Sequence, residues 1–405
     1  MKMSQRVAEE VLGRMHERYA RRGRKGKGRI LEEFCEQWGY SRKHAIKLLS
    51  GKRAQKAEEE RRGRPARYGE EVLEPLKTIW QAGEQMCGKR LAAAMPLWLP
   101  YYRKRFRRLS KRVERDLCEM SPATINRLLA PIRCVIPKRL CGTKPGSLLK
   151  TQIPVRTEHW DATQPGYLEA DTVAHCGQSL AGDFVWTVTY TDIYSGWTAS
   201  RAVWNKGATQ IVEKTRQLEA ELPFPILGFD CDNGSEFLNH HLVRYFSQRS
   251  RPVAFTRSRP YHKDDNAHVE QKNWSRVRQL LGYDRLGSPE LLEPINRLYR
   301  ELWDPLQNFF CPSVKLLSKT RIGSRYRRRY DCPQTPCDRL LQSSAVDPAA
   351  KRRLREVRRK LDPFALKEAI ERALRRILAQ PLHSSRPTGS LRSEAALAKA
   401  ENITN

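Results

Sequence analysis

Three acidic residues stand in contexts suited to binding a divalent cation: Asp171 in LEADTVAH, Asp232 in GFDCDNGSEF and Glu270 in KDDNAHVEQKNW. Asp171 falls within a predicted strand, Asp232 directly ends another, and Glu270 lies in the first turns of a predicted helix. Adjacent strands with a helix packed on them would bring these carboxylates to one edge of a sheet. Carboxylates repel one another unless a cation joins them. Their hard oxygens favour Mg²⁺, which also binds water and substrate phosphate oxygens.

The predicted helix around Glu270 orients its side chain. Glu270 shares a stripe with Trp274, Val277 and Leu281, at positions i, i+4, i+7 and i+11. This spacing predicts that the carboxylate faces the sheet rather than open water. An acid on a core-facing stripe is costly unless it is paired, so the pattern favours a function for Glu270.

Two further acids compete for the same roles. Asp230 precedes Asp232 by two residues on the same predicted strand and points to the same face. The strand-end position of Asp232 and the Asn-Gly turn after it favour Asp232. Glu169 stands in the same relation to Asp171, and the residues alone leave that choice open.

The segments around these acids predict a mixed sheet flanked by helices, because β-branched and aromatic runs alternate with helical patterns. Three strands joined by short turns, followed by alternating helices and strands, are typical of such a sheet. We predict strands over 166–174, 184–192, 196–203, 226–231 and 252–257, and helices over 207–221, 235–248 and 265–282.

The charge of the chain indicates a polyanionic partner. Its 405 residues contain 76 Lys and Arg against 45 Asp and Glu, a net charge of +31. No stretch approaches the ~18 uninterrupted apolar residues of a membrane-spanning helix, and the start lacks the apolar region of a signal peptide. We therefore expect a cytoplasmic, nucleoid-associated protein with no membrane partner. Its ten cysteines form no CxxC pair, which disfavours zinc and predicts buried, reduced thiols.

The first 52 residues predict a helix-turn-helix unit. Helices are expected over 4–20, 29–38 and 41–50, and their apolar stripes leave four polar side chains of the third helix exposed, namely Arg42, Lys43, His44 and Lys47. A short turn between two such helices is typical of DNA-binding helix-turn-helix proteins. The pattern alone fits an ordinary three-helix bundle equally well, and the charge of the chain favours DNA binding.

A basic linker and a second helical unit follow. Residues 53–69 carry charge without periodicity, and Arg62 and Arg64 lie in an RGRP tetrapeptide that resembles the core of an AT-hook, which lays arginines into the minor groove. A solvated basic linker is the alternative. In the second unit we predict helices over 70–82, 87–98 and 121–132, and Arg127 is expected to project from a second recognition helix.

The three acidic segments resemble the catalytic core of DDE transposases of the retroviral-integrase type. The resemblance rests on Asp-Asn-Gly-x-Glu-Phe at 232–237 and on Val-Glu at 269–270, with 37 residues between Asp232 and Glu270, and it spans about 160–285. The helix-turn-helix start and the basic C-terminal region resemble bacterial insertion-sequence transposases more than retroviral integrases, whose His-His-Cys-Cys zinc module is absent.

This resemblance implies an RNase H-like fold and a metal-binding catalytic triad of Asp171, Asp232 and Glu270. Two Mg²⁺ ions, for which Mn²⁺ is expected to substitute, would serve phosphodiester cleavage and joining. The implied protein is a transposase that binds the terminal inverted repeats of its mobile element, cleaves the 3′ ends and transfers them into target DNA. The expected partners are double-stranded DNA, both element ends and target, and further copies of the chain in a synaptic complex.

The residues beside Glu270 are expected to contact DNA. Lys263 and Lys272, with Gln271 and Asn273, flank it and are suited to phosphate contacts, although ordinary solvated side chains are the alternative. The sequence does not tell whether a helper ATPase takes part.

The predicted architecture is a multidomain α+β chain. In its C-terminal region two helices are expected to start at Asp347-Pro348 and Asp362-Pro363, after a short barrel or irregular segment over 310–341. The expected parts are a helix-turn-helix domain (1–52), a basic linker (53–69), a second helical DNA-binding domain (70–150), an RNase H-like α/β mixed-sheet core (160–285), a basic C-terminal region (300–381) and a disordered tail (382–405).

Three other functions fit parts of the pattern. A catalytically silent, sequence-specific DNA-binding regulator derived from a transposase would keep the fold but lack an acid, whereas all three acids are present. An RNase H-like nuclease that cuts without joining would need no helix-turn-helix reader. A tyrosine or serine recombinase is disfavoured because neither an Arg-rich active-site pattern nor a distinct nucleophile segment stands out.

Overall fold

The computed structural model describes residues 5–50, 67–133, 162–205, 207–231, 237, 239–257, 272–323 and 325–379. Its two compact units are Met1–Arg67 and Tyr68–Asn405, which we treat separately. Several predicted features lie outside the described residues: Asp232, Glu270, Lys263, Arg62, Arg64, most of the basic linker, the first turns of the helix over 265–282 and the C-terminal tail.

Over its described residues, the first unit contains three helices, α1 (Gln5–Ala20), α2 (Arg24–Trp38) and α3 (Arg42–Leu49). Helix α2 begins earlier than predicted although it includes Gly26 and Gly28, which have low helix propensity. Gly39 ends α2 with φ +68°, a left-handed conformation that glycine adopts at low cost, and the chain enters α3 two residues later. The helices enclose a core of their own, made of Met15, Ile30, Leu31, Phe34, Ala45 and Leu49.

Four helices open the second unit: α5 (Glu70–Ala82), α6 (Gly88–Arg105), α7 (Lys111–Glu119) and α8 (Pro122–Leu129), the last followed by a 3₁₀ turn over Ala130–Ile132. Helix α6 continues through Pro96 and Pro100, beyond the predicted end at 98. Helix α7 was not predicted. Its sequence, KRVERDLCE, buries only Val113, Asp116 and Leu117, too few positions to show a clear apolar stripe.

A five-stranded sheet lies at the centre of this unit. Its strands are β1 (Tyr167–Ala174), β2 (Val185–Asp192), β3 (Thr198–Trp204), β4 (Gly228–Cys231) and β5 (Ala254–Arg257), in the order β3-β2-β1-β4-β5. Strand β2 runs antiparallel to β1 and β3, whereas β1, β4 and β5 are parallel. The predicted mixed sheet is therefore confirmed.

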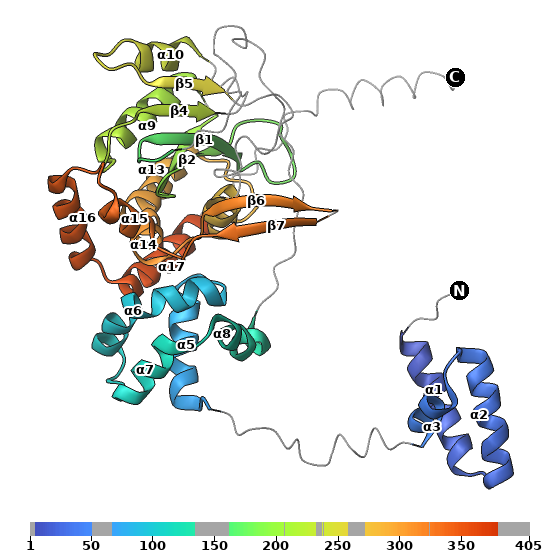
Figure 1. Ribbon diagram of the computed structural model, residues 1–405. Helices are drawn as coiled ribbons and strands as arrows, with labels where there is room; N and C mark the ends of the chain where they lie inside the picture. The colour runs from blue at the N-terminus through green and yellow to red at the C-terminus, as the bar shows by residue number, and fades with distance from the viewer. Residues whose placement is uncertain are drawn as a thin grey trace, which may run out of the picture. The chain divides into compact units, whose positions relative to one another are not determined.

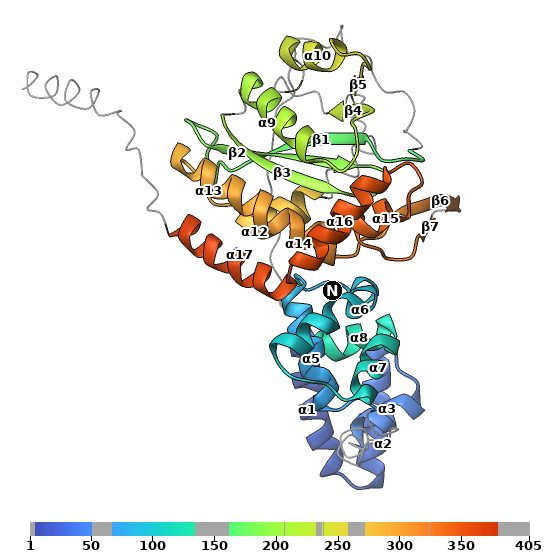
Figure 2. The same cartoon turned by 90° about the vertical axis from the view of Figure 1, so that its left-hand side faces the viewer.

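Helices cover both faces of the sheet. Helices α9 (Ala208–Glu221) and α10 (His240–Ser247) lie on one face, and α13 (Leu292–Arg297) and α14 (Asp304–Phe310) lie on the other (Figures 1 and 2). The second group belongs to a helical stretch over 289–310 that was not predicted, with a 3₁₀ turn at Pro289–Leu291 and a π-helix at Leu298–Trp303 between α13 and α14.

The C-terminal part contains a hairpin and three helices. Strands β6 (Leu316–Ile322) and β7 (Arg325–Tyr330) form the hairpin, and α15 (Pro336–Gln342), α16 (Pro348–Lys360) and α17 (Pro363–Leu378) follow. The segment 310–341 is thus neither a barrel nor irregular. The two predicted helix starts are confirmed, because the Asp347 and Asp362 carboxylates accept hydrogen bonds from the first turns of α16 and α17.

One hydrophobic core runs through the second unit, from α5 to α17. The indole of Trp98, on α6, donates a 2.9 Å hydrogen bond to the Phe310 carbonyl on α14, and its ring meets that of Phe364 on α17 edge to face. The helices predicted as a second DNA-binding domain over 70–150 therefore pack on the C-terminal helices rather than standing apart. A fragment over 160–285 would lack α13 and α14, which cover one face of the sheet, so experiments on the core require the full chain.

The cysteines correct one expectation. Among the described residues, Cys176, Cys231, Cys311 and Cys337 are buried free thiols, but Cys87, Cys118 and Cys332 are exposed. Within the same residues, no helix combines the length and apolar character needed to cross a membrane.

Candidate functional site

The edge between β1 and β4 brings two of the acidic segments together. The two strands pair in parallel, with Leu168 beside Phe229 and Ala170 beside Cys231. Ala170 and Cys231 immediately precede Asp171 and Asp232 in the sequence. The described pairing of β1 with β4 therefore ends at the residues that precede Asp171 and Asp232.

The Asp171 carboxylate also contacts the segment that follows Glu270. Its Oδ1 accepts a 2.7 Å hydrogen bond from the Thr172 N–H, and its Oδ2 accepts a 2.5 Å hydrogen bond from the Asn273 side-chain amide. Asn273 comes three residues after Glu270. Asn273, which was expected to contact DNA phosphates, therefore links the segment around Glu270 to the strand that carries Asp171.

The competing acids are more deeply buried than Asp171. Glu169 and Asp230 are 1% and 0% exposed and face each other in the β1–β4 register, whereas Asp171 is half-buried. The Asp230 Oδ1 accepts a 2.5 Å hydrogen bond from the Thr256 hydroxyl on β5. Since a catalytic carboxylate must reach its substrate, this difference favours Asp171 over Glu169.

The structure does not test the complete metal triad, because Asp232 and Glu270 lie outside the described residues. Within the described ranges, no group of three or more His, Cys, Asp or Glu side chains is placed to hold a metal ion. Asp171 is the member of the predicted triad whose surroundings can be described.

The apolar stripe predicted behind Glu270 is wrong in one position. Val277 and Leu281 are buried as expected, but Trp274 is 47% exposed. Residues Asn273–Arg278 form a π-helix, which precedes a short α12 (Gln279–Leu281). A π-helix rotates side chains away from the 3.6-residue period on which the stripe was based, and such turns occur frequently at functional sites.

Lys272 is less exposed than we expected for a residue that contacts DNA phosphates. It is half-buried, and loss of solvent, followed by the nearby charges of Arg276, Arg90 and Arg339, lowers its pKa well below the usual value. Arg276 is buried beside it and donates to the Gln307 side chain. This cluster of cations sits one residue from the Asn273–Asp171 contact.

His175 follows β1 directly and is fully buried. Its Nε2 pairs with the Thr187 hydroxyl at 2.8 Å, and that hydroxyl pairs with the Tyr299 hydroxyl at 3.0 Å. Its Nδ1 has no hydrogen-bond partner among the described residues. Burial, reinforced by the Arg278 charge, lowers the pKa of His175 from 6.5 to about 3, so the imidazole is neutral and structural, as a lone histidine is expected to be.

The setting of His175 predicts a loss of stability in acid. The unfolded chain takes up a proton at this residue below about pH 6.5 and the folded chain does not, so its contribution is fully present above that pH and is lost as pH falls toward about 3. Between pH 6.5 and 5 the wild type should lose about 1.5 kcal/mol more than His175→Gln, which keeps a hydrogen-bonding side chain. Urea unfolding at both pH values measures this, and equal losses would contradict it.

The predicted recognition surface of α3 is exposed. Ala45 and Leu49 are buried and Leu48 is half-buried, while Arg42, Lys43, His44 and Lys47 all face solvent. The Arg42 guanidinium lies 3.7 Å from the Glu32 carboxylate on α2, and the His44 ring meets the Tyr40 ring edge-on. In the second unit, Arg127 on α8 is also exposed.

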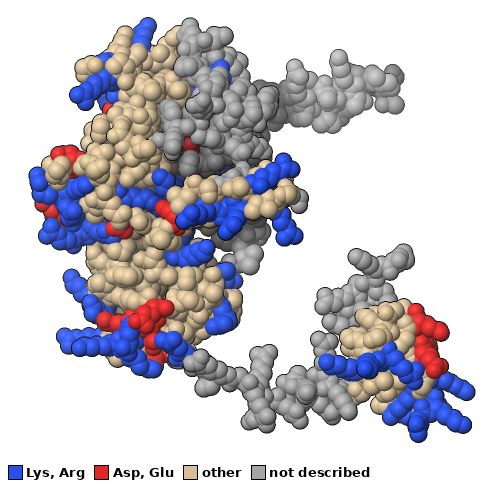
Figure 3. All heavy atoms as spheres, in the orientation of Figure 1, with Lys and Arg blue, Asp and Glu red and all other residues tan. Residues whose placement is uncertain are grey.

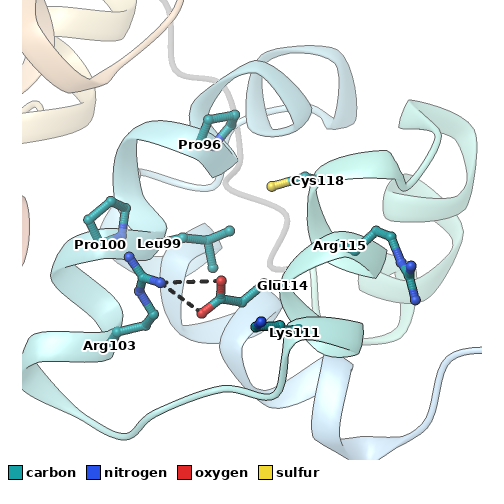
Figure 4. Close-up of a pocket in the computed structure, with 8 residues that line it drawn as sticks. All are labelled: Pro96, Leu99, Pro100, Arg103, Lys111, Glu114, Arg115 and Cys118. Atoms are coloured by element: carbon teal, nitrogen blue, oxygen red, sulfur yellow. Dashed lines mark hydrogen bonds and ion pairs between the residues drawn. The ribbon is translucent and has the colours of Figure 1, made fainter.

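Lys and Arg side chains are spread over the surface, with a concentration on the β6–β7 hairpin (Figure 3). A surface pocket lies between α6 and α7, and Arg103 and Glu114 form an ion pair across it at 3.1 Å (Figure 4). Desolvation and the carboxylates of Glu114 and Glu119 raise the pKa of the Cys118 thiol in this pocket, which disfavours its reactive thiolate form.

Comparison with known proteins places the chain in a family. No model of a known protein family matches the sequence. The uncharacterized protein y4rM of Sinorhizobium fredii is 40% identical over 344 residues, which cover 84% of this chain and 96% of that protein. The chain belongs to the y4rM family. Because the match spans nearly the whole relative, members of the y4rM family are expected to share one architecture.

Solved structures give weaker similarities. The catalytic core domain of BIV integrase is 17% identical, with a TM-score of 0.23, covering 29% of this y4rM-family chain and 68% of that chain. The HTLV-2 integrase catalytic core domain in complex with magnesium is 17% identical, with a TM-score of 0.24, covering 29% and 71%. TM-scores at this level support no conclusion, so the description of the fold rests on the strand order and pairing given above.

Proposed function

We propose that the chain is a transposase that joins the 3′ ends of a mobile element to target DNA. The observation that carries this proposal is the hydrogen bond from Asn273 to Asp171, together with the β1–β4 register. The first links Asp171 to the residue three positions after Glu270, and the second pairs the residues that precede Asp171 and Asp232, which supports the proposal that the three acids share one edge of the sheet. The net charge of +31 fits a polyanionic substrate.

The donor set fits a hard divalent cation, since all three proposed ligands are carboxylates. Asp171, Asp232 and Glu270 would hold two Mg²⁺ ions, or Mn²⁺ in their place. When bound, such ions supply an activated oxygen nucleophile and neutralise the phosphate charge. Asn273 is a positioning residue, because its amide and the Thr172 N–H together fix the rotation of the Asp171 carboxylate.

Exposed cations outside the acidic site would bind and orient DNA. We propose that α3 contacts the terminal repeats through Arg42, Lys43, His44 and Lys47, and that Arg127 on α8 contacts phosphates. Lys263, Arg62 and Arg64 are proposed as further contacts. Two element ends must meet for joining, so the proposal includes a homo-oligomer assembled on DNA.

A strand-transfer assay tests the function. The purified full chain is incubated with a linear DNA carrying the terminal repeat and with a plasmid target, in Mg²⁺, Mn²⁺ or Ca²⁺. Joined products should form with Mg²⁺ and Mn²⁺ and be scarce with Ca²⁺, whose looser coordination supports little of this chemistry. Binding to the repeat without any cleavage would support the alternative of a silent DNA-binding regulator, and cleavage without joining would support a nuclease.

Substitutions on α3 test the recognition of the repeat. We expect Lys43 or Lys47 to contact a base of the terminal repeat. Replacing such a residue with alanine removes that contact and should weaken binding to the repeat by ~1–3 kcal/mol. Lys25→Ala removes an equally exposed charge from α2 and is the matched control. Gel shifts on repeat and random DNA provide the comparison. Equal losses on both DNAs for every variant would show that α3 does not read sequence.

A further inference from the structure

The β6–β7 hairpin is rich in positive charge and carries no negative charge. Over residues 316–330 the sequence LLSKTRIGSRYRRRY contains no Asp or Glu. Six of these residues are basic: Lys319, Arg321, Arg325, Arg327, Arg328 and Arg329. All of β7 is exposed, and no acidic side chain in the described part of the chain forms an ion pair with its arginines. Such a row of like charges repels itself until a polyanion neutralises it.

The strand register sorts these arginines onto two faces. Arg325, Arg327 and Arg329 pair with Ile322, Thr320 and Ser318, so these six side chains share one face of the hairpin. Tyr326 and Arg328 occupy the alternate positions of β7 and so lie on the opposite face. Three alternate residues of a strand span about 13 Å, a length over which a DNA duplex presents on the order of eight phosphates.

Apolar groups on the same hairpin are also exposed to solvent. Leu317 and Ile322 are 60% and 58% exposed, and Tyr326 is 50% exposed. A two-stranded hairpin without further packing is at best marginally stable in water. Because the exposed apolar and charged side chains of this hairpin are not packed, they add little to its stability. Their combination is typical of a surface that binds a partner, where arginine and tyrosine are enriched.

The root of the hairpin is fixed to the central sheet. Lys315 and Asp331 close it through backbone and side-chain hydrogen bonds, and the Lys315 ammonium donates to the Tyr194 carbonyl at 2.6 Å. The buried guanidinium of Arg339 donates to the Asp331 carboxylate at 2.9 Å and to the Ser195 carbonyl at 3.1 Å. Tyr194 and Ser195 belong to the turn between β2 and β3. The hairpin is therefore a projecting arm with a held base (Figure 1).

We propose that the β6–β7 hairpin is a DNA-docking arm whose Arg325, Arg327 and Arg329 contact the phosphates of a duplex. The inference rests on the proposed function, which supplies DNA as the partner, and it assigns a binding element outside the acidic site and outside α3. A two-stranded ribbon fits the major groove, which is about 12 Å wide, with its arginines near the groove walls. Contacts of this kind position the duplex without reading its sequence.

A matched pair of charge variants tests the arm. The first variant is Arg325→Gln, Arg327→Gln and Arg329→Gln; the control is Arg352→Gln, Arg353→Gln and Arg355→Gln on α16, which loses the same charge from exposed positions. In Figure 1 the hairpin projects away from α16. Binding of each full-length protein to DNA duplexes with and without the terminal repeat, and to an RNA duplex of equal length, is measured over a salt series by fluorescence anisotropy.

The arm variant should bind both DNA duplexes about 10- to 100-fold more weakly near 0.1 M salt. Its slope of log affinity against log salt should shrink by about 2–3, since each lost phosphate contact removes about 0.9. The α16 variant should shift the slope by less than about 1. Equal changes in the two variants would mean that only net charge matters and would overturn the proposal, as would a loss confined to the RNA duplex.

The failure of this proposal is distinguishable from the failure of the proposed function. If the wild type joins no strands while the arm variant still loses its salt slope, the transposase assignment fails and the docking arm stands. If the wild type joins strands and the arm variant keeps the full slope and affinity, the arm is rejected and the transposase assignment stands.

Discussion

Replacing Asp171 with asparagine is expected to lower strand transfer by more than about 100-fold while the protein stays folded and bound to DNA. Even partners of metal ligands typically contribute 10- to 100-fold, and a direct carboxylate ligand should contribute more. The substitution is sterically mild. The Asn273 side-chain oxygen is buried without a hydrogen-bond partner in the described structure, so rotation of its amide lets it accept from the amide introduced at position 171.

The measurement uses gel shifts and strand transfer on the same preparation. Asp183→Asn is the matched control, because it makes the same change in an exposed loop between β1 and β2. The control should retain wild-type joining. Joining by Asp171→Asn at a rate near that of the wild type in Mg²⁺ would remove Asp171 from the site and return Glu169 as the candidate on β1.

The second large effect is expected in the buried ion pair beneath β3. The Arg201 guanidinium, 4% exposed, lies 2.9 Å from the Asp304 carboxylate on α14, which also accepts from the Ser200 N–H. Asp304→Ala removes the buried partner and leaves a desolvated cation. Breaking such a pair typically costs 3–5 kcal/mol, and we expect a loss of about 3 kcal/mol or more in the free energy of unfolding.

Arg201 itself supplies the control, because a second carboxylate reaches it. Glu221, on α9, lies 2.5 Å from the same guanidinium, but its side chain is 42% exposed. Glu221→Ala should therefore cost less than about 1 kcal/mol. Desolvation raises the pKa of Asp304 to about 6, so urea unfolding is measured at pH 7.5, where the Asp304 carboxylate is charged. Similar losses for the two variants would contradict the role of burial.

The central sheet was predictable because its strands are rich in β-branched and aromatic residues. Strand β2, VWTVTYTD, is buried along its whole length, and such a run has few other stable conformations. The predicted bounds of β1 differ from the observed ones by one residue. The capped starts at Asp347 and Asp362 were predictable because capping is local chemistry.

Other parts depend on contacts between distant residues and could not be predicted. The stripe through Trp274 assumed an α-helix, and the sequence carries no signal for a π-helix over 273–278. The helices over 289–310, which cover the second face of the sheet, were not predicted. Their side chains Asn296 and Asn308 donate hydrogen bonds to backbone carbonyls of β3, about 100 residues away in the sequence.

The candidate site was predictable only in part. The identities of Asp171, Asp232 and Glu270 follow from their motifs, and they remain predictions as a triad. The contact between Asn273 and Asp171 joins residues 102 positions apart, so no local pattern shows it. The docking arm was not predictable for another reason. The arginines of RYRRRY indicate a charged surface, but only the pairing of β6 with β7 shows which of them lie on the same face.

The separate cores of the two units determine how this family can evolve. The first unit closes its core within α1–α3, so a recombination event in the segment after α3 would exchange it with that core intact. Helices α5–α8 have no such freedom, because Trp98 is fitted against Phe310 and Phe364. We expect relatives to replace the first unit wholesale, as a cassette, and to change α5–α8 only by point substitution coordinated with α14 and α17.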